Sequence, residues 1–203
     1  MASAATDLRN AGVSAVLEPS DDGYDDAVAG FDLGVECAPD VVVDARTPAD
    51  VAGTVAAIAE RGDRLSVFGS GHGRLAPVEG GAAISLRSFT HVEVDTANLT
   101  ARIGAGCTWD PVLAAATPHG LAPPCGSAPG VGVIGYLLGG GLGPLASSFG
   151  FSSDHVRSFD IVTPADGAIT VAAGPTGGGS SAIAAPLDQS QSPGSPEPVR
   201  AAI

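Results

Sequence analysis

Two glycine-framed segments hold the residue types most suited to chemistry in this sequence. The first consists of Gly69, Ser70, Gly71, His72 and Gly73 and directly follows a predicted strand. Glycines on both sides of His72 allow the backbone to approach a ligand closely and place the imidazole on a tight turn. The amides of such a loop can also form a concave anion site for phosphates. An alternative stays open, in which the loop is a strand-ending turn with a merely solvated histidine.

The second segment covers residues 126–143 and contains the pattern G-x-G-x-x-G at Gly130, Gly132 and Gly135. This pattern is a dinucleotide fingerprint only when a strand precedes it. The stretch before it contains three prolines and no strand pattern, which disfavours a nicotinamide-dependent dehydrogenase. We expect a short apolar helix over residues 131–138, whose N-terminus could face a pyrophosphate. The competing explanation is that the glycines allow close packing between this helix and a sheet.

The elements before the first segment have clear local signals. The β-branched run at residues 41–43 predicts a buried strand. A helix should begin at Thr47, with Asp50 where the acid of a capping box belongs, and end at Gly62. An extended pattern over residues 65–68 then leads into the first glycine segment.

The middle of the chain is predicted to be richer in strands. A strand is expected over residues 82–86, and apolar residues alternate over 92–103 as in a hairpin. Thr108 is placed to cap a short helix that ends near Gly120. A second hairpin is expected over residues 156–172.

Composition excludes several function classes. The sequence has 22 acidic and nine basic residues, a formal net charge of −13, and every basic residue is arginine. Without lysine there is neither a lysine-containing phosphate loop nor a Schiff-base enzyme, and an acidic chain is a poor partner for nucleic acid. No apolar run approaches the ~18 residues of a membrane span, and three widely spaced cysteines indicate neither a disulfide framework nor a zinc site. We therefore expect a cytoplasmic protein with neither nucleic acid nor membrane as partner.

Taken together, the motifs resemble the FAD-binding half of flavoprotein oxidases in the p-cresol methylhydroxylase/vanillyl-alcohol oxidase superfamily. The similarity is greatest to its berberine-bridge-enzyme-like bacterial oxidoreductases. The matching motifs follow the family's order: R-T-P-A-D-V at 46–51, G-S-G-H-G at 69–73, T-A-R-I-G-A-G-C-T-W at 100–109, H-G-L at 119–121, the glycine-rich segment 126–143 and D-H-V at 154–156.

The resemblance implies an α+β FAD-binding domain of two α+β subdomains with the flavin between them. With the residue pattern and composition on either side of the motifs, the chain divides into an N-terminal lead-in with one short helix (1–35), the FAD-binding domain (36–173) and a Gly/Pro/Ser-rich tail (174–203), which its composition predicts to be disordered. His72 matches the histidine that many members bond to the flavin 8α carbon, which a neutral imidazole can attack. The cofactor contacts implied are Gly69, Ser70, Gly71, His72, Gly73, Gly126, Ser127, Gly132, Val133, Gly135 and Tyr136.

Two departures from the family limit the expected function. Members with two covalent links have a cysteine where this chain has Ala128, and Cys125 lies three residues earlier, so we expect at most one link, through His72. Full-length members also add a substrate domain that supplies the catalytic base, and this sequence is therefore interpreted as truncated. The expected activity is hydride transfer from an alcohol, sugar or similar C–H donor to flavin and then to dioxygen, with a small-molecule substrate only if a substrate domain is supplied. The alternative is a non-catalytic FAD-binding module that needs a partner chain.

Overall fold

The computed structural model describes residues 2–74 and 76–172, and the chain divides into two compact units. Among the described residues, the first unit contains residues up to Phe89 and Val162–Ile169, and the second contains Thr90–Ile161 and residues 170–172. Each unit combines helices and strands, which confirms the expected α+β class. The tail predicted over residues 174–203 lies outside the described residues.

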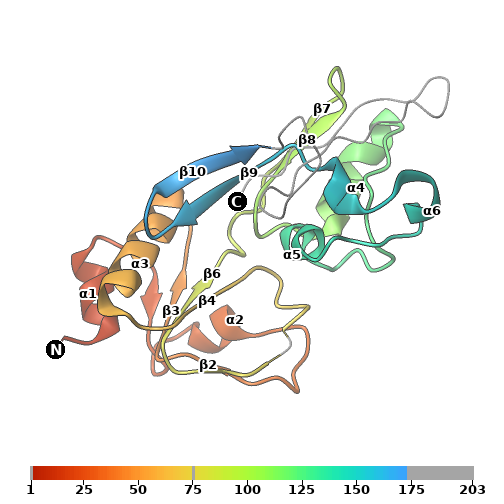
Figure 1. The fold of residues 1–203 in the computed structure, drawn as a ribbon. Helices are drawn as coiled ribbons and strands as arrows, with labels where there is room; N and C mark the ends of the chain where they lie inside the picture. The colour runs from red at the N-terminus through yellow and green to blue at the C-terminus, as the bar shows by residue number, and fades with distance from the viewer. Residues whose placement is uncertain (1, 75, 173–203) are drawn as a thin grey trace. The chain divides into compact units, whose positions relative to one another are not determined.

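A four-stranded sheet organises the first unit (Figure 1). Strands β3, β6 and β4 are parallel, and β1 pairs antiparallel with β3. The register aligns Asp44, Ser85 and Phe68 at the carboxyl edge of the three parallel strands. Parallel strands are covered on both faces, which explains why all three valines of β3 are buried. In sheet order the strands are β1 (Val16–Leu17), β3 (Val41–Asp44), β6 (Ala82–Ser85) and β4 (Leu65–Phe68).

Helices cover both faces of this sheet. Figure 1 shows α1 (Ala4–Asn10) beside α3 (Pro48–Arg61) on one side of β3 and α2 (Tyr24–Val28) on the other. Three residues of α2 form a buried cluster with Val42 of β3 and Ala83 of β6. A separate parallel pair joins β2 (Cys37–Ala38) to β5 (Val78–Glu79).

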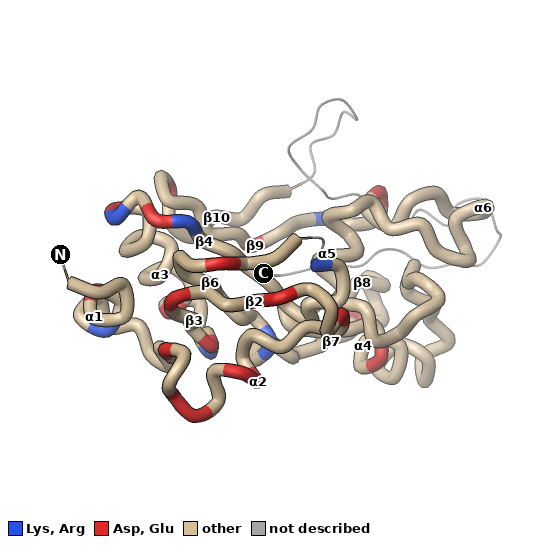
Figure 2. Tube along the Cα trace, turned by 90° about the horizontal axis from the view of Figure 1, so that it is seen from below, with Lys and Arg blue, Asp and Glu red and all other residues tan. Residues whose placement is uncertain are grey.

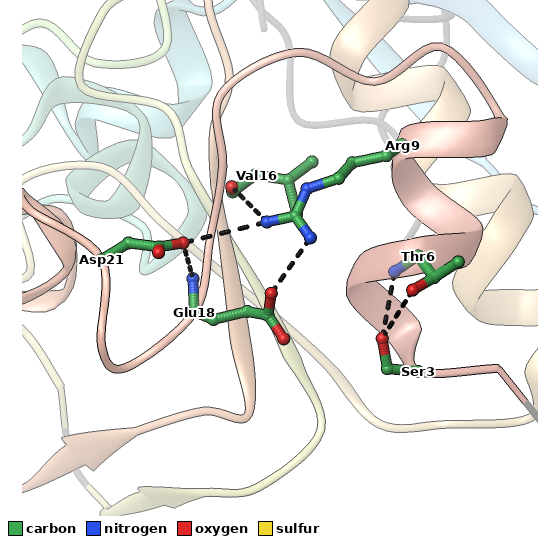
Figure 3. Close-up of polar contacts among 6 residues, drawn as sticks. All are labelled: Ser3, Thr6, Arg9, Val16, Glu18 and Asp21. Carbon is green, nitrogen blue, oxygen red and sulfur yellow. Dashed lines mark hydrogen bonds and ion pairs between the residues drawn. The ribbon is translucent and has the colours of Figure 1, made fainter.

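The first 35 residues contain more structure than predicted. We expected one short helix, whereas this segment supplies α1, α2 and strand β1 of the sheet. Arg9 of α1 donates to the Val16 carbonyl (3.2 Å) and to the Glu18 carboxylate (3.0 Å), and Ser3 caps the helix (Figure 3). The Arg9 and Glu18 side chains are 47% and 40% exposed, so this pair contributes at most about 1 kcal/mol. The segment is held mainly by burial of its apolar residues, such as Leu8.

The predicted capping of α3 is confirmed. Thr47 and Asp50 form a reciprocal capping box, and Gly62 ends the helix with φ +69°. The Asp50 carboxylate also accepts from the backbone N–H (2.9 Å) and hydroxyl (2.7 Å) of Ser14. Burial alone would raise the pKa of Asp50, but the hydrogen bonds from Ser14, Thr47 and the backbone lower it below the usual range of a carboxyl.

The second unit begins with the predicted hairpin, in which Val92 of β7 pairs with Ile103 of β8. The helix after Thr108 is also confirmed, although the Thr108 side chain makes no cap bond. The short apolar helix starts two residues later than expected, because the Val131 carbonyl accepts from Trp109 and Gly132 is extended. The elements after residue 90 are β7 (Val92–Asp95), β8 (Thr100–Ile103), α4 (Trp109–Ala116), a 3-10 turn (Thr117–His119), α5 (Val133–Leu138), α6 (Ala146–Phe149), a second 3-10 turn (Ser152–His155), and the hairpin strands β9 (Ser158–Thr163) and β10 (Gly167–Ala172). The turn of this last hairpin, within Val162–Ile169, is assigned to the first unit.

Acidic positions outnumber basic ones along the trace and recur on the segment that leads into α2 (Figure 2). The excess of acidic positions corresponds to the net charge of −13. Within residues 2–74 and 76–172, no helix combines the length and the apolar character that crossing a bilayer requires.

Candidate cofactor-binding site

The first glycine segment forms a loop at the carboxyl end of β4. The His72 imidazole stacks on Phe31, with ring centroids 4.2 Å apart and planes 28° from parallel. The His72 backbone N–H donates to the Ser70 hydroxyl at 3.4 Å. Among the described residues, Nδ1 of His72 is buried without a hydrogen-bond partner. The loop therefore holds the imidazole against Phe31, with one buried ring nitrogen that lacks a hydrogen-bond partner among the described residues.

Glycine is required where this loop meets the segment after α2. Gly71 has φ +70°, and a Cβ added to it would lie 3.0 Å from the Cα of Gly30. A Cβ on Gly30 would in turn lie 3.0 Å from Nη1 of Arg74. The close approach of these two backbones explains why the loop needs a glycine before the histidine.

Two arginines that we did not predict fix the loop. Arg87, two residues after β6, donates to the Gly69 carbonyl at 3.1 Å. Arg74 donates to the Val28 carbonyl at the end of α2 and lies 4.9 Å from the centre of the Phe68 ring. Burial lowers the pKa of Arg87, and the nearby Arg74 lowers it further. No sequence motif contains Arg87, and no local pattern singles out Phe31. The one sequence feature that could have drawn attention to Arg87 is that arginine replaces lysine throughout the chain.

The second segment is attached to the start of α4. Gly132 forms an antiparallel bridge with Thr108, and the Val133 N–H donates to the Cys107 carbonyl at 2.9 Å. Val133 is fully buried and its N–H is already bonded to the Cys107 carbonyl, so neither its side chain nor its N–H is open to a ligand. Ser127 and Gly135 are exposed, and a Cβ on Gly135 would meet open space.

Tyr136 of α5 lies among glycines. A Cβ on Gly126 would lie 3.0 Å from its ring, and one on Gly141 would overlap the ring at 2.5 Å. Trp109 meets the ring edge-on at a centroid distance of 5.6 Å. Within the described part of the chain, the Tyr136 hydroxyl is buried and unpartnered. Close packing against the Tyr136 ring thus accounts for the glycine at position 126.

The predicted contacts form two groups, one in each unit. Residues 69–73 belong to the first unit and residues 126–136 to the second. Each group contains one buried polar atom with no partner in the described residues, Nδ1 of His72 and the hydroxyl of Tyr136. An unpartnered buried polar atom is costly, so each group by itself has one polar atom, beside glycine-rich backbone, that a polar cofactor could satisfy.

Cys125 has the properties of an unreactive thiol. It is half-buried, and burial raises the pKa of its thiol. A protonated thiol is a poor nucleophile. The expectation of at most one covalent link, through His72, stays a prediction.

The sequence matches known FAD enzymes. The family model described as "FAD binding domain" matches residues 39–173. The chain is 32% identical over 150 residues to (R)-6-hydroxynicotine oxidase of Paenarthrobacter nicotinovorans, which covers 73% of this chain and 33% of that protein. It is 36% identical over 127 residues to an FAD-dependent monooxygenase of Fusarium proliferatum, covering 61% and 25% of the two chains.

Solved structures agree. The crystal structure of 6-hydroxy-D-nicotine oxidase from Arthrobacter nicotinovorans superposes with a TM-score of 0.71 at 30% identity, covering 80% of this chain and 36% of that one. Glucooligosaccharide oxidase from Acremonium strictum, which carries a 6-S-cysteinyl, 8α-N1-histidyl FAD, gives 0.73 at 27% identity and covers 84% and 37%. The chain thus spans about a third of the length of these relatives. It belongs to the FAD binding domain family, with the fold of the p-cresol-methylhydroxylase-type and berberine-bridge-enzyme-like flavoprotein oxidases.

Proposed function

We propose that this chain binds FAD through residues 69–73 and 126–136 and attaches it covalently through His72. In this proposal it is the FAD-binding part of an oxidoreductase that transfers a hydride from an alcohol, sugar or similar C–H donor to flavin and then to dioxygen. The flavin supplies the electron acceptor, and we assign no catalytic residue of this chain. We place the protein in the cytoplasm, where its three free cysteines suit a reducing environment.

The observation that carries the proposal is the state of His72. Its Nδ1 is buried without a partner in the described residues, while its ring is stacked on Phe31. A ring nitrogen must be free of a hydrogen bond to form a bond to carbon. Joining it to the flavin methyl carbon would remove two protons and two electrons, which dioxygen would take up as hydrogen peroxide. The histidyl FAD named for glucooligosaccharide oxidase supports the same chemistry here.

The backbone would provide the remaining contacts. The loop over residues 69–73 and the start of α5 are both rich in glycine. Backbone amides in such segments can bind a pyrophosphate without a charged side chain. Neither group contains a lysine or arginine. We therefore expect FAD binding to depend weakly on salt, since backbone amides and not mobile cations hold the phosphates.

Acid precipitation after incubation with FAD in air tests the proposal. The wild-type chain should retain flavin colour and fluorescence in the washed, denatured pellet, and His72→Ala should release it. His119→Ala is the matched control, because His119 is exposed at the end of a 3-10 turn, and it should retain flavin like the wild type. Complete release from the wild type, or retention by His72→Ala, would overturn the proposed attachment.

The second candidate function is a non-catalytic module that requires a partner chain. Its support is the exposure of large apolar side chains in the second unit. Leu142 is 71% exposed and Phe151 is 52% exposed, as is usual where another surface packs. Co-expression with the C-terminal part of 6-hydroxynicotine oxidase tests this candidate, which fails if FAD retention and oxidase turnover do not rise.

A further inference from the structure

We propose that Arg87 is a positioning residue, which holds the His72 loop in the geometry needed for attachment to the flavin. The effect on flavin attachment rests on the proposed function. The positioning itself is argued from contacts within the first unit. Arg87 lies outside every motif that carries the family resemblance.

One guanidinium joins three backbone carbonyls from two segments. Nε of Arg87 donates to Gly69, the first residue of the loop, at 3.1 Å. Nη1 donates to the Asp26 carbonyl of α2 at 2.7 Å, and Nη2 donates to the Ala29 carbonyl just beyond that helix. Gly69 and Ala29 are 40 residues apart in sequence, so this side chain fixes their relative position.

The C-terminus of α2 requires such a donor. The last carbonyls of a helix have no partner within the helix, and they attract positive charge. Arg74 serves the Val28 carbonyl at 3.1 Å, which leaves those of Asp26 and Ala29 to Arg87. The planar guanidinium presents its donors in a fixed fork, which lysine cannot reproduce.

His72 lies between the two segments that Arg87 holds. On one side, Gly69 begins the loop that carries the histidine. On the other, Ala29 is followed by Phe31, whose N–H donates to the Gly71 carbonyl at 3.4 Å and whose ring stacks on the imidazole. Release of either segment would allow the imidazole to rotate, and loss of orientation slows a bond-forming step.

Substitution of Arg87 should leave the fold intact. Arg87 borders a pocket of about 340 Å³, which is also lined by Arg46, Asp44 and Asp26. Water entering this pocket beside Asp26 can hydrate a carbonyl that a shorter side chain would leave without a donor. The pocket also supplies a control residue, Arg46. It lines the same pocket, but its side chain is 68% exposed and contacts the Asp44 carboxylate at 3.5 Å.

The test compares wild type, Arg87→Ala, Arg87→Lys and Arg46→Ala by the rate at which acid-stable flavin forms. We expect Arg87→Ala to be at least about tenfold slower, a factor equivalent to about 1.4 kcal/mol of lost positioning. Arg87→Lys should recover part of the rate, since its ammonium can reach some of the carbonyls. Arg46→Ala should match the wild type. Total bound FAD is measured in parallel, and it should fall less than the covalent fraction.

Hydrogen exchange of the apo chain gives a readout that needs no flavin. Amides of residues 70–73 and of Phe31 should exchange faster in Arg87→Ala, while those of α3 should be unchanged. If the wild type forms no acid-stable flavin, the proposed attachment fails and exchange alone decides the positioning role. Equal attachment rates or unchanged exchange in the loop would overturn the inference. If Arg87→Ala does not fold, the attachment rate and the hydrogen exchange of Arg87→Lys are compared with those of the wild type instead.

Discussion

Replacement of Asp50 by asparagine should destabilise the first unit and remove part of its acid sensitivity. Asp50 is 4% exposed and lies in the first turn of α3. One oxygen accepts from the N–H and hydroxyl of Ser14 at 2.9 and 2.7 Å. The other accepts from the Thr47 N–H (2.9 Å), the Thr47 hydroxyl (2.8 Å) and the Arg46 N–H (3.2 Å). The carboxylate therefore satisfies three backbone donors at once.

The size of the effect follows from these contacts. Asparagine keeps one acceptor oxygen, so either the N–H of Ser14 or those of Arg46 and Thr47 lose their partner. The two hydroxyls can rotate to other acceptors. Each unsatisfied buried donor costs about 1–3 kcal/mol, and the substitution should therefore lower the free energy of unfolding by about 2–4 kcal/mol. That is a large share of the ~5–15 kcal/mol typical of a folded domain.

The pH dependence follows from the direction of the pKa shift. The pKa of Asp50 is lower in the folded chain than in the unfolded one. Its stabilising contribution is therefore complete above the unfolded value of about 3.9 and is lost as pH falls toward the folded value. Asparagine does not titrate, so the difference between wild type and Asp50→Asn should shrink as pH falls below about 4.

Urea unfolding followed by circular dichroism at pH 7 and pH 3 measures both effects. Glu60→Gln, an exposed carboxylate on the same helix, is the control and should change the unfolding free energy by less than about 0.5 kcal/mol. The reasoning is refuted if Asp50→Asn matches this control at pH 7, or if its destabilisation is the same at both pH values.

Three further substitutions test the packing and the chemistry of the site. A Cβ on Gly143 would overlap the Cys125 carbonyl oxygen, so Gly143→Ala should lower the thermal midpoint, with a cost of about 1–3 kcal/mol; Gly130→Ala, which meets open space, should not. Cys125→Ala should leave the acid-stable flavin yield unchanged, and a fall in yield would show that this thiol takes part. Tyr24→Phe removes the hydroxyl that donates to the buried Pro39 carbonyl and should cost about 1–2 kcal/mol in urea unfolding, whereas an unchanged midpoint would argue against that bond.

The elements with strong local signals were predictable from sequence. The helix beginning after Thr47 has its capping box, an apolar stripe and a glycine stop within one continuous segment, and each signal acts over a few residues. In the hairpin of β7 and β8, apolar and polar residues likewise alternate on the two strands, which a short turn connects. The family, and with it the cofactor, was recognisable because several motifs occur in a fixed order.

Short elements were not predictable, for a physical reason. Strand β1 has two residues and α2 has five, too few to show a hydrophobic period. Such pieces are unstable alone and exist here because Tyr24 and Val28 pack against Val42 and Ala83 of the sheet. Their formation depends on contacts with residues distant in sequence.

The sequence alone determined which residues form the glycine loops and placed His72 between two glycines. It could not determine how the imidazole is oriented, because the groups that orient it come from elsewhere in the chain. Phe31 stacks on the ring, and Arg87 holds both neighbouring segments. Local backbone preference decides where a turn forms, whereas the partners of a side chain are set when the sheet brings distant segments together. The tertiary structure therefore placed a glycine-flanked histidine against Phe31, with a buried Nδ1 that has no hydrogen-bond partner among the described residues.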